Sequence, residues 1–136
     1  MADERGMVTA FVAAITVALV LFIGLVFDGG NILAARRQAI DEAEGAARAA
    51  AQSIDSSSRR TGMVALDPGR VEAAAQAFLA PTGHQGRAVT DGRQVTVTVS
   101  FVQPMYILGI GGLVSRTVSG RGTARAARGI DVVEGP

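Results

Sequence analysis

The 136-residue sequence predicts an α+β protein: a long N-terminal transmembrane helix extended into a stalk, followed by a small domain in which one helix covers a roughly three-stranded antiparallel sheet. Three observations lead to this prediction. Residues 7–27 form one apolar run, residues 31–53 repeat alanine at helical spacing, and residues 94–102 alternate between apolar and polar side chains. The order of these segments places the membrane anchor before the folded domain.

The apolar run from Met7 to Phe27 contains no charged residue and only two hydroxyl groups, those of Thr9 and Thr16. A helix of this length measures about 31 Å, close to the thickness of about 30 Å of a bilayer's hydrocarbon core. A hydroxyl is tolerated there because it can bond back to a helical carbonyl. The alternative to a membrane anchor is a cleaved signal peptide. The run is longer than the apolar part of such a peptide, and no small-residue cleavage site follows it. We therefore expect a retained anchor.

Small residues recur every four positions along the predicted span. This spacing places them on one helix face, where helices in lipid approach closely and associate. The alternative is that alanine is simply abundant in this chain. The expected subunit-packing stripe in the span consists of Gly6, Ala10, Ala14 and Ala18.

The helical pattern continues from Asn31 to Ser53 and predicts a stalk that prolongs the span. One face of this stalk is again built from small residues and needs either a partner helix or the chain's own domain against it. The residues of this face included in the predicted subunit packing are Ala39, Ala43, Ala46 and Ala50.

The remainder predicts the small domain. Asp67 and Pro68 suit the N-cap and first position of a helix that Pro81 ends. The valine–threonine alternation of Gln94–Val102 predicts a strand with one wet face, and the turn at Asp91–Gly92 pairs it with residues 87–90.

The apolar stretch after Pro104 is too short to span a bilayer, and predicts a buried connection or a patch against the membrane or a neighbouring subunit. A last strand is expected near Arg116–Ala127, where Gly120 and Gly122 indicate a bulge or a close approach of another backbone. The predicted boundaries are 1–54 for span and stalk, 55–66 for a linker, 67–129 for the small α+β domain and 130–136 for a loose tail.

Nothing in the sequence predicts an enzyme. There is no cysteine, and the one histidine, His84, lies in a Gly- and Gln-containing loop where a solvated role is expected. The glycines of residues 109–112 lack the remainder of a dinucleotide or phosphate-loop motif. We expect no metal, no cofactor and no small-molecule substrate. The net charge of +1, and a weak basic run without aromatic residues at Arg121, Arg125 and Arg128, argue against nucleic acid.

Residues Glu4 to about Ile54 resemble the N-terminal region of the TadE/TadG-like proteins of the Tad (Flp) pilus, a branch of type IV pili. The resemblance is carried by Glu4-Arg5-Gly6 before the span, Asp28-Gly29-Gly30 after it, and the Arg- and Ala-rich helix that follows. The later Val–Thr strand, the Pro104 segment and the final Thr-Val-Ser strand are similar to actinobacterial members.

The resemblance implies a minor pilin or pseudopilin with a pilin-like stalk, acting in filament assembly or adhesion. Its partners would be other pilin-like subunits, the assembly machinery and the bilayer. It also implies a cytoplasmic N-terminus and an extracellular C-terminal domain, whereas a count of Arg36, Arg37 and Arg48 after the span points the opposite way. The alternative is a membrane-anchored binding or accessory module that does not enter a filament.

The acidic N-terminus adds one expectation. The chain begins Met1-Ala2-Asp3-Glu4 with no glycine before the acid, so cleavage by a prepilin peptidase is not expected. We expect Glu4, or Asp3, to pair with the terminal amine of a neighbouring subunit during packing.

Overall fold

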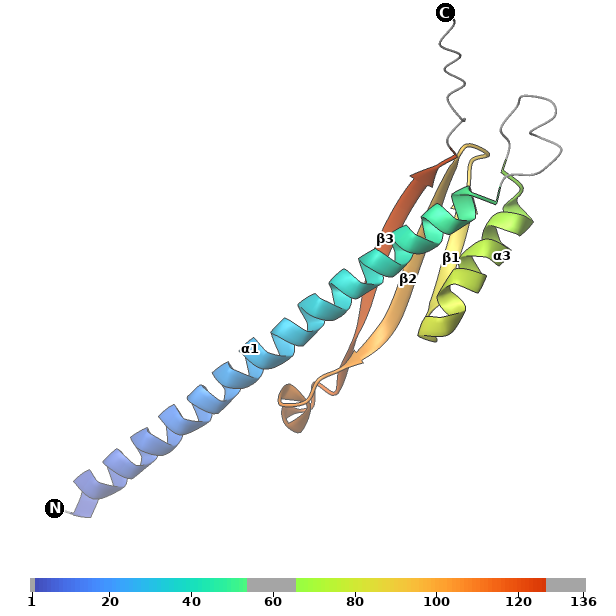
Figure 1. Ribbon diagram of the computed structural model, residues 1–136. Helices are drawn as coiled ribbons and strands as arrows, with labels where there is room; N and C mark the ends of the chain where they lie inside the picture. The colour runs from blue at the N-terminus through green and yellow to red at the C-terminus, as the bar shows by residue number, and fades with distance from the viewer. Residues whose placement is uncertain (1, 54–65, 127–136) are drawn as a thin grey trace, which may run out of the picture. The chain divides into compact units, whose positions relative to one another are not determined.

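The structure is a computed structural model that describes residues 2–53 and 66–126 (Figure 1). It confirms the predicted α+β fold, with a long N-terminal helix, one shorter helix and a three-stranded antiparallel sheet in the order β1-β2-β3. The elements are α1 (Ala2–Ala51), α3 (Pro68–Leu79), the 3₁₀ turn η1 (Ala80–Thr82), β1 (Gln85–Thr90), β2 (Gln94–Pro104), the 3₁₀ turn η2 (Leu108–Gly111) and β3 (Ser115–Arg125).

The described residues divide into two compact units. The first comprises residues 2–35 and 102–118, which are the N-terminal part of α1, the end of β2, the start of β3 and the connection between these strands. The second comprises residues 36–53, 66–101 and 119–126 and contains the hydrophobic core.

In the first unit, α1 carries a helical segment long and apolar enough to cross a membrane. The large apolar side chains between Met7 and Phe27 are exposed, as a lipid-facing helix requires. The Thr16 hydroxyl donates to the carbonyl oxygen of Val12 at 2.8 Å, so this polar group is satisfied within the helix, as expected. Among residues 2–53 and 66–126, this is the one helix that could cross a membrane by length and composition, and it lies near the N-terminus.

In the second unit, two helices rather than one cover the same face of the sheet. The core joins small side chains of α1 to the apolar face of α3 and to the inward valines of β2. From the sequence we expected only α3 in this layer, because the alanine face of the stalk fits a partner helix as well as a sheet. The α1 residues in this core are Ala43, Ala46, Ala47, Ala50 and Ala51.

Two glycines of β3 allow α1 to lie directly on the strand. A Cβ atom at Gly120 would fall inside van der Waals contact of the backbone of Ala39 and Ile40, and one at Gly122 would collide with the backbone at Ala43. Of the two expectations for this glycine pair, the structure shows the close approach.

The predicted helix start and hairpin are both present. The Asp67 carboxylate accepts a hydrogen bond from the backbone N–H of Arg70 at 2.9 Å, which caps α3. In the hairpin, Thr90 pairs with Val95. Asp91 accepts from the backbone N–H groups of Arg93 and Gln94 at 3.0 and 2.7 Å, which fixes the turn.

Two segments of the predicted organisation lie outside the described residues: the linker, apart from Leu66, and the tail. Leu66 itself is 4% exposed and belongs to the core, and its N–H donates to the carbonyl of Gly92 at 3.1 Å.

Gly120→Ala should destabilise the second unit by about 1–3 kcal/mol, the usual cost of overpacking a tight interface. The new methyl group would push α1 away from β3. Thermal unfolding in detergent, followed by circular dichroism, measures the loss. Gly30→Ala is the control, because nothing lies within 4 Å of its added methyl group; equal melting shifts for the two variants would contradict the packing described.

The hairpin turn should weaken in acid. The backbone hydrogen bonds from Arg93 and Gln94 lower the pKa of Asp91, against a smaller opposing effect of desolvation and with help from the charge of Arg125. A carboxyl group whose pKa is lower in the folded state stabilises the fold at pH values above its ordinary pKa of about 3.9. This stabilisation is lost as the pH falls through the folded-state pKa. The stability difference between wild type and Asp91→Ala should therefore be present at neutral pH and shrink in strong acid. A difference that is independent of pH would contradict this account.

Candidate functional site

The first unit brings the carboxylate of Asp28 together with the connection between β2 and β3. Asp28 follows the predicted span directly and is only 1% exposed. Its Oδ1 accepts from the N–H of Tyr106 at 3.0 Å, and its Oδ2 accepts from the N–H groups of Ile107 and Leu108 at 3.0 and 2.7 Å. Three donors satisfy the buried carboxylate and favour its ionised form. We call residues 105–114 the apolar loop and this set of bonds the Asp28 latch.

The apolar loop is also positioned by direct packing on α1. A Cβ atom at Gly24 would lie 2.6 Å from a methyl carbon of Ile107 and 3.6 Å from one of Leu108. A larger residue at position 24 would displace the loop. Gly24 precedes Asp28 by four residues, about one helical turn, so latch and packing lie on one face of α1.

The latch was not predicted from the sequence. Asp28 stood out only as part of the Asp28-Gly29-Gly30 segment that follows the span, and the Pro104 segment as a connection or patch. One feature of the sequence does point to it. A single carboxylate follows the span, and the charge-free loop has backbone N–H groups that need acceptors. The sequence does not reveal that the two meet, because nearly eighty residues separate them.

The predicted packing residues fall into two sets. In the span, Gly6, Ala10, Ala14 and Ala18 are exposed in the single chain, so their small-residue face is uncovered. The side chain of Glu4 lies outside the described residues, and its pairing with a neighbouring subunit stays a prediction.

The alanine face of the stalk is placed differently from the subunit packing that we expected. All four of its residues are fully buried within the second unit. The reason is physical: the glycines of β3 leave room for α1, so the chain's own sheet covers this face. The residues so covered are Ala39, Ala43, Ala46 and Ala50.

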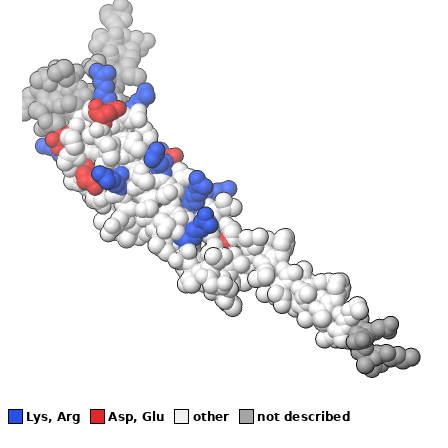
Figure 2. All heavy atoms as spheres, turned by 180° about the vertical axis from the view of Figure 1, so that it is seen from behind, with Lys and Arg blue, Asp and Glu red and all other residues white. Residues whose placement is uncertain are grey.

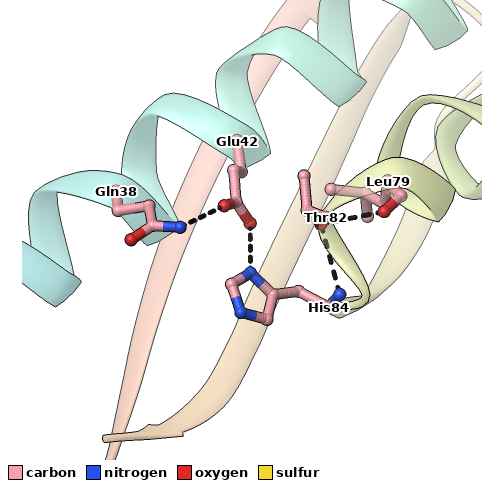
Figure 3. A network of polar contacts seen from close by, with 5 residues as sticks. All are labelled: Gln38, Glu42, Leu79, Thr82 and His84. Carbon is pink, nitrogen blue, oxygen red and sulfur yellow. Dashed lines mark hydrogen bonds and ion pairs between the residues drawn. The ribbon is translucent and has the colours of Figure 1, made fainter.

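His84 is not the solvated loop residue that the sequence suggested. Its Nδ1 lies 2.8 Å from Oε2 of Glu42 (Figure 3). Its ring also stacks on Phe101, with the ring centroids 3.9 Å apart. The Glu42 carboxylate also accepts from Gln38 at 2.8 Å. The Thr82 hydroxyl donates to the carbonyl of Leu79 and accepts from the His84 N–H, which fixes the loop. These contacts tie α1 to the end of α3 and have the character of structural bracing.

A third feature of the second unit is a shallow pocket of about 400 Å³ with two arginines, Arg36 from α1 and Arg121 from β3. Ile40, Thr98, Ser119 and Gly120 complete its lining. Figure 2 shows basic side chains interspersed with acidic ones on one face of the described residues. The pocket can attract an anion. Among the described residues, no three His, Asp or Glu side chains could hold a metal ion together.

The comparison with protein families gives one match. Residues 6–53, about a third of the chain, match the family described as putative Flp pilus-assembly TadE/G-like. The match confirms the resemblance predicted from the sequence and covers the candidate span together with the stalk. It supports a pilus-associated role. No curated protein and no solved structure was found to match this chain.

Asp28→Ala should release the apolar loop. A hydrogen bond to a charged group contributes about 1.5–3 kcal/mol, and three are lost together. Hydrogen exchange of the Tyr106, Ile107 and Leu108 amides should accelerate by more than about tenfold, which corresponds to 1.4 kcal/mol. Asp41→Ala, which removes an exposed carboxylate from the same helix, is the control. Unchanged exchange of the three amides in Asp28→Ala would refute the latch.

Proposed function

We propose that this TadE/G-like membrane protein is a structural subunit, a minor pilin or pseudopilin, of a Tad/Flp-type pilus or a related secretion apparatus. It is anchored by the α1 span, with the N-terminus in the cytoplasm and the sheet domain outside the cell. Its role is to pack and to position, with no catalytic step.

The uncovered small-residue stripe in the span is the observation that carries this proposal. Gly6, Ala10, Ala14 and Ala18 lie on one face of α1, within the segment that matches the pilus-assembly family. In lipid the hydrophobic effect does not drive helices together, so close approach of backbones over small residues is a main source of association. A face of this kind suits a neighbouring helix of another pilin-like subunit.

The outer part of the molecule supports a packing role as well. Its polar groups are used internally: Glu42 and His84 brace α1 against the end of α3, and Asp91 fixes the hairpin. These bonds hold a rigid domain on the stalk. The orientation follows from the family resemblance, which we weigh above the charge count around the span.

The second candidate is a membrane-anchored accessory module that stays outside any filament. One observation favours it: the alanine face of the stalk is buried against the chain's own sheet. That face is therefore not available to other subunits, whereas the stripe in the span is exposed.

Ala14→Leu separates the two candidates. Enlarging the stripe should cost about 1–3 kcal/mol of helix packing, and 1.4 kcal/mol lowers an association about tenfold. On the structural-subunit proposal, the C-terminally tagged protein appears in the surface fraction sheared from intact cells together with filament material, and Ala14→Leu removes most of it. Val12→Phe, which enlarges the opposite helix face, is the matched control and should be retained.

Two outcomes would contradict the proposal. If the tagged protein stays in the membrane pellet, is clipped by external protease and is indifferent to Ala14→Leu, the accessory module is the correct function. If the tag is protected in cells whose wall has been removed, the proposed orientation is wrong.

A further inference from the structure

We propose that the apolar loop, residues 105–114, is a second membrane contact: held by the Asp28 latch beside the last turn of the span, it inserts its apolar side chains into the outer boundary of the same bilayer. This inference depends on α1 spanning the membrane and not on the pilus role.

The surface of the loop has the chemistry of a lipid-facing segment. Ile110 is 90% exposed, and Leu113 and Val114 are 59% and 67% exposed. No charged residue occurs between Arg93 and Arg116. Tyr106, 63% exposed, has the amphipathic ring that is enriched at membrane–water interfaces. A soluble surface rarely presents so many apolar side chains on ten residues, so a partner of low polarity is indicated.

The loop also satisfies much of its own backbone, which lowers the cost of entering lipid. In the Asp28 latch, one carboxylate accepts hydrogen bonds from three backbone N–H groups of the loop. Within the loop, Met105 N–H donates to Val114, Ile110 to Ile107, Gly112 to Gly109 and Leu113 to Leu108, at 3.0–3.2 Å.

The position of the loop identifies lipid as the partner. Ile107 packs on Gly24, three residues inside the end of the predicted span at Phe27. Three residues of helix correspond to about 4.5 Å, so this contact lies at the edge of the hydrocarbon core if the span fills it. The exposed side chains of the loop therefore continue an apolar surface that is already in contact with lipid.

The test uses the full chain in vesicles of equal parts phosphatidylcholine and phosphatidylglycerol. The sequence contains no tryptophan, so a single introduced indole reports its own surroundings. Ile110→Trp and Leu113→Trp probe the loop at two exposed positions, which accept a larger ring. Val89→Trp, exposed on β1 of the second unit, is the control. Acyl chains brominated close to the glycerol backbone should quench both loop probes and leave Val89→Trp unquenched.

The result that overturns the inference is quenching of the loop probes no stronger than that of Val89→Trp. Emission that shifts to the blue only as the number of chains per vesicle increases, without quenching by brominated lipid, also overturns it. The loop would then be covered by a second copy of the chain rather than by lipid.

Discussion

The close approach of α1 to β3 is the constraint on which the second unit depends. Alanine and valine bury little area each, so a core built from them is stable only when the backbones come near enough for dense contact. Gly120 and Gly122 provide this approach, since any side chain there would meet the backbone of α1. The bracing of His84 between Glu42 and Phe101 and the capping of α3 by Asp67 add polar order around this packed layer.

The first unit solves a different problem, that of a charge beside a membrane. An ionised carboxylate at the end of a span is costly unless it is solvated or hydrogen-bonded. Asp28 is hydrogen-bonded three times by backbone N–H groups that would themselves need acceptors. The same three hydrogen bonds therefore stabilise the charge of Asp28 and give the N–H groups of the loop their acceptors. In this unit the described residues leave both the apolar side chains of the span, with its small-residue stripe, and those of the loop exposed.

Local patterns predicted most of the fold. The length of the apolar run, the Asp67–Pro68 helix start, the valine–threonine alternation and the Asp91–Gly92 turn each depend on neighbours in sequence, and each is present. What the sequence did not reveal depends on which distant segments meet. The alanine face of the stalk is compatible with a partner helix or a sheet, and only the three-dimensional arrangement shows that β3 covers it. His84 looked solvated because its partners, Glu42 and Phe101, are remote in sequence, and Asp28 looked like a simple boundary for the same reason.

The latch has a consequence for the order of events during synthesis. Its donors follow Asp28 by 78 to 80 residues, so the carboxylate leaves the ribosome long before the loop exists. At about 5–20 residues per second, the interval lasts several seconds. During this time Asp28 is a charge without its later hydrogen-bond donors, directly after an apolar helix, and moving it into the hydrocarbon core would be costly. The same charge therefore marks where the span ends while the chain is being inserted, and later orders the loop once the sheet has formed.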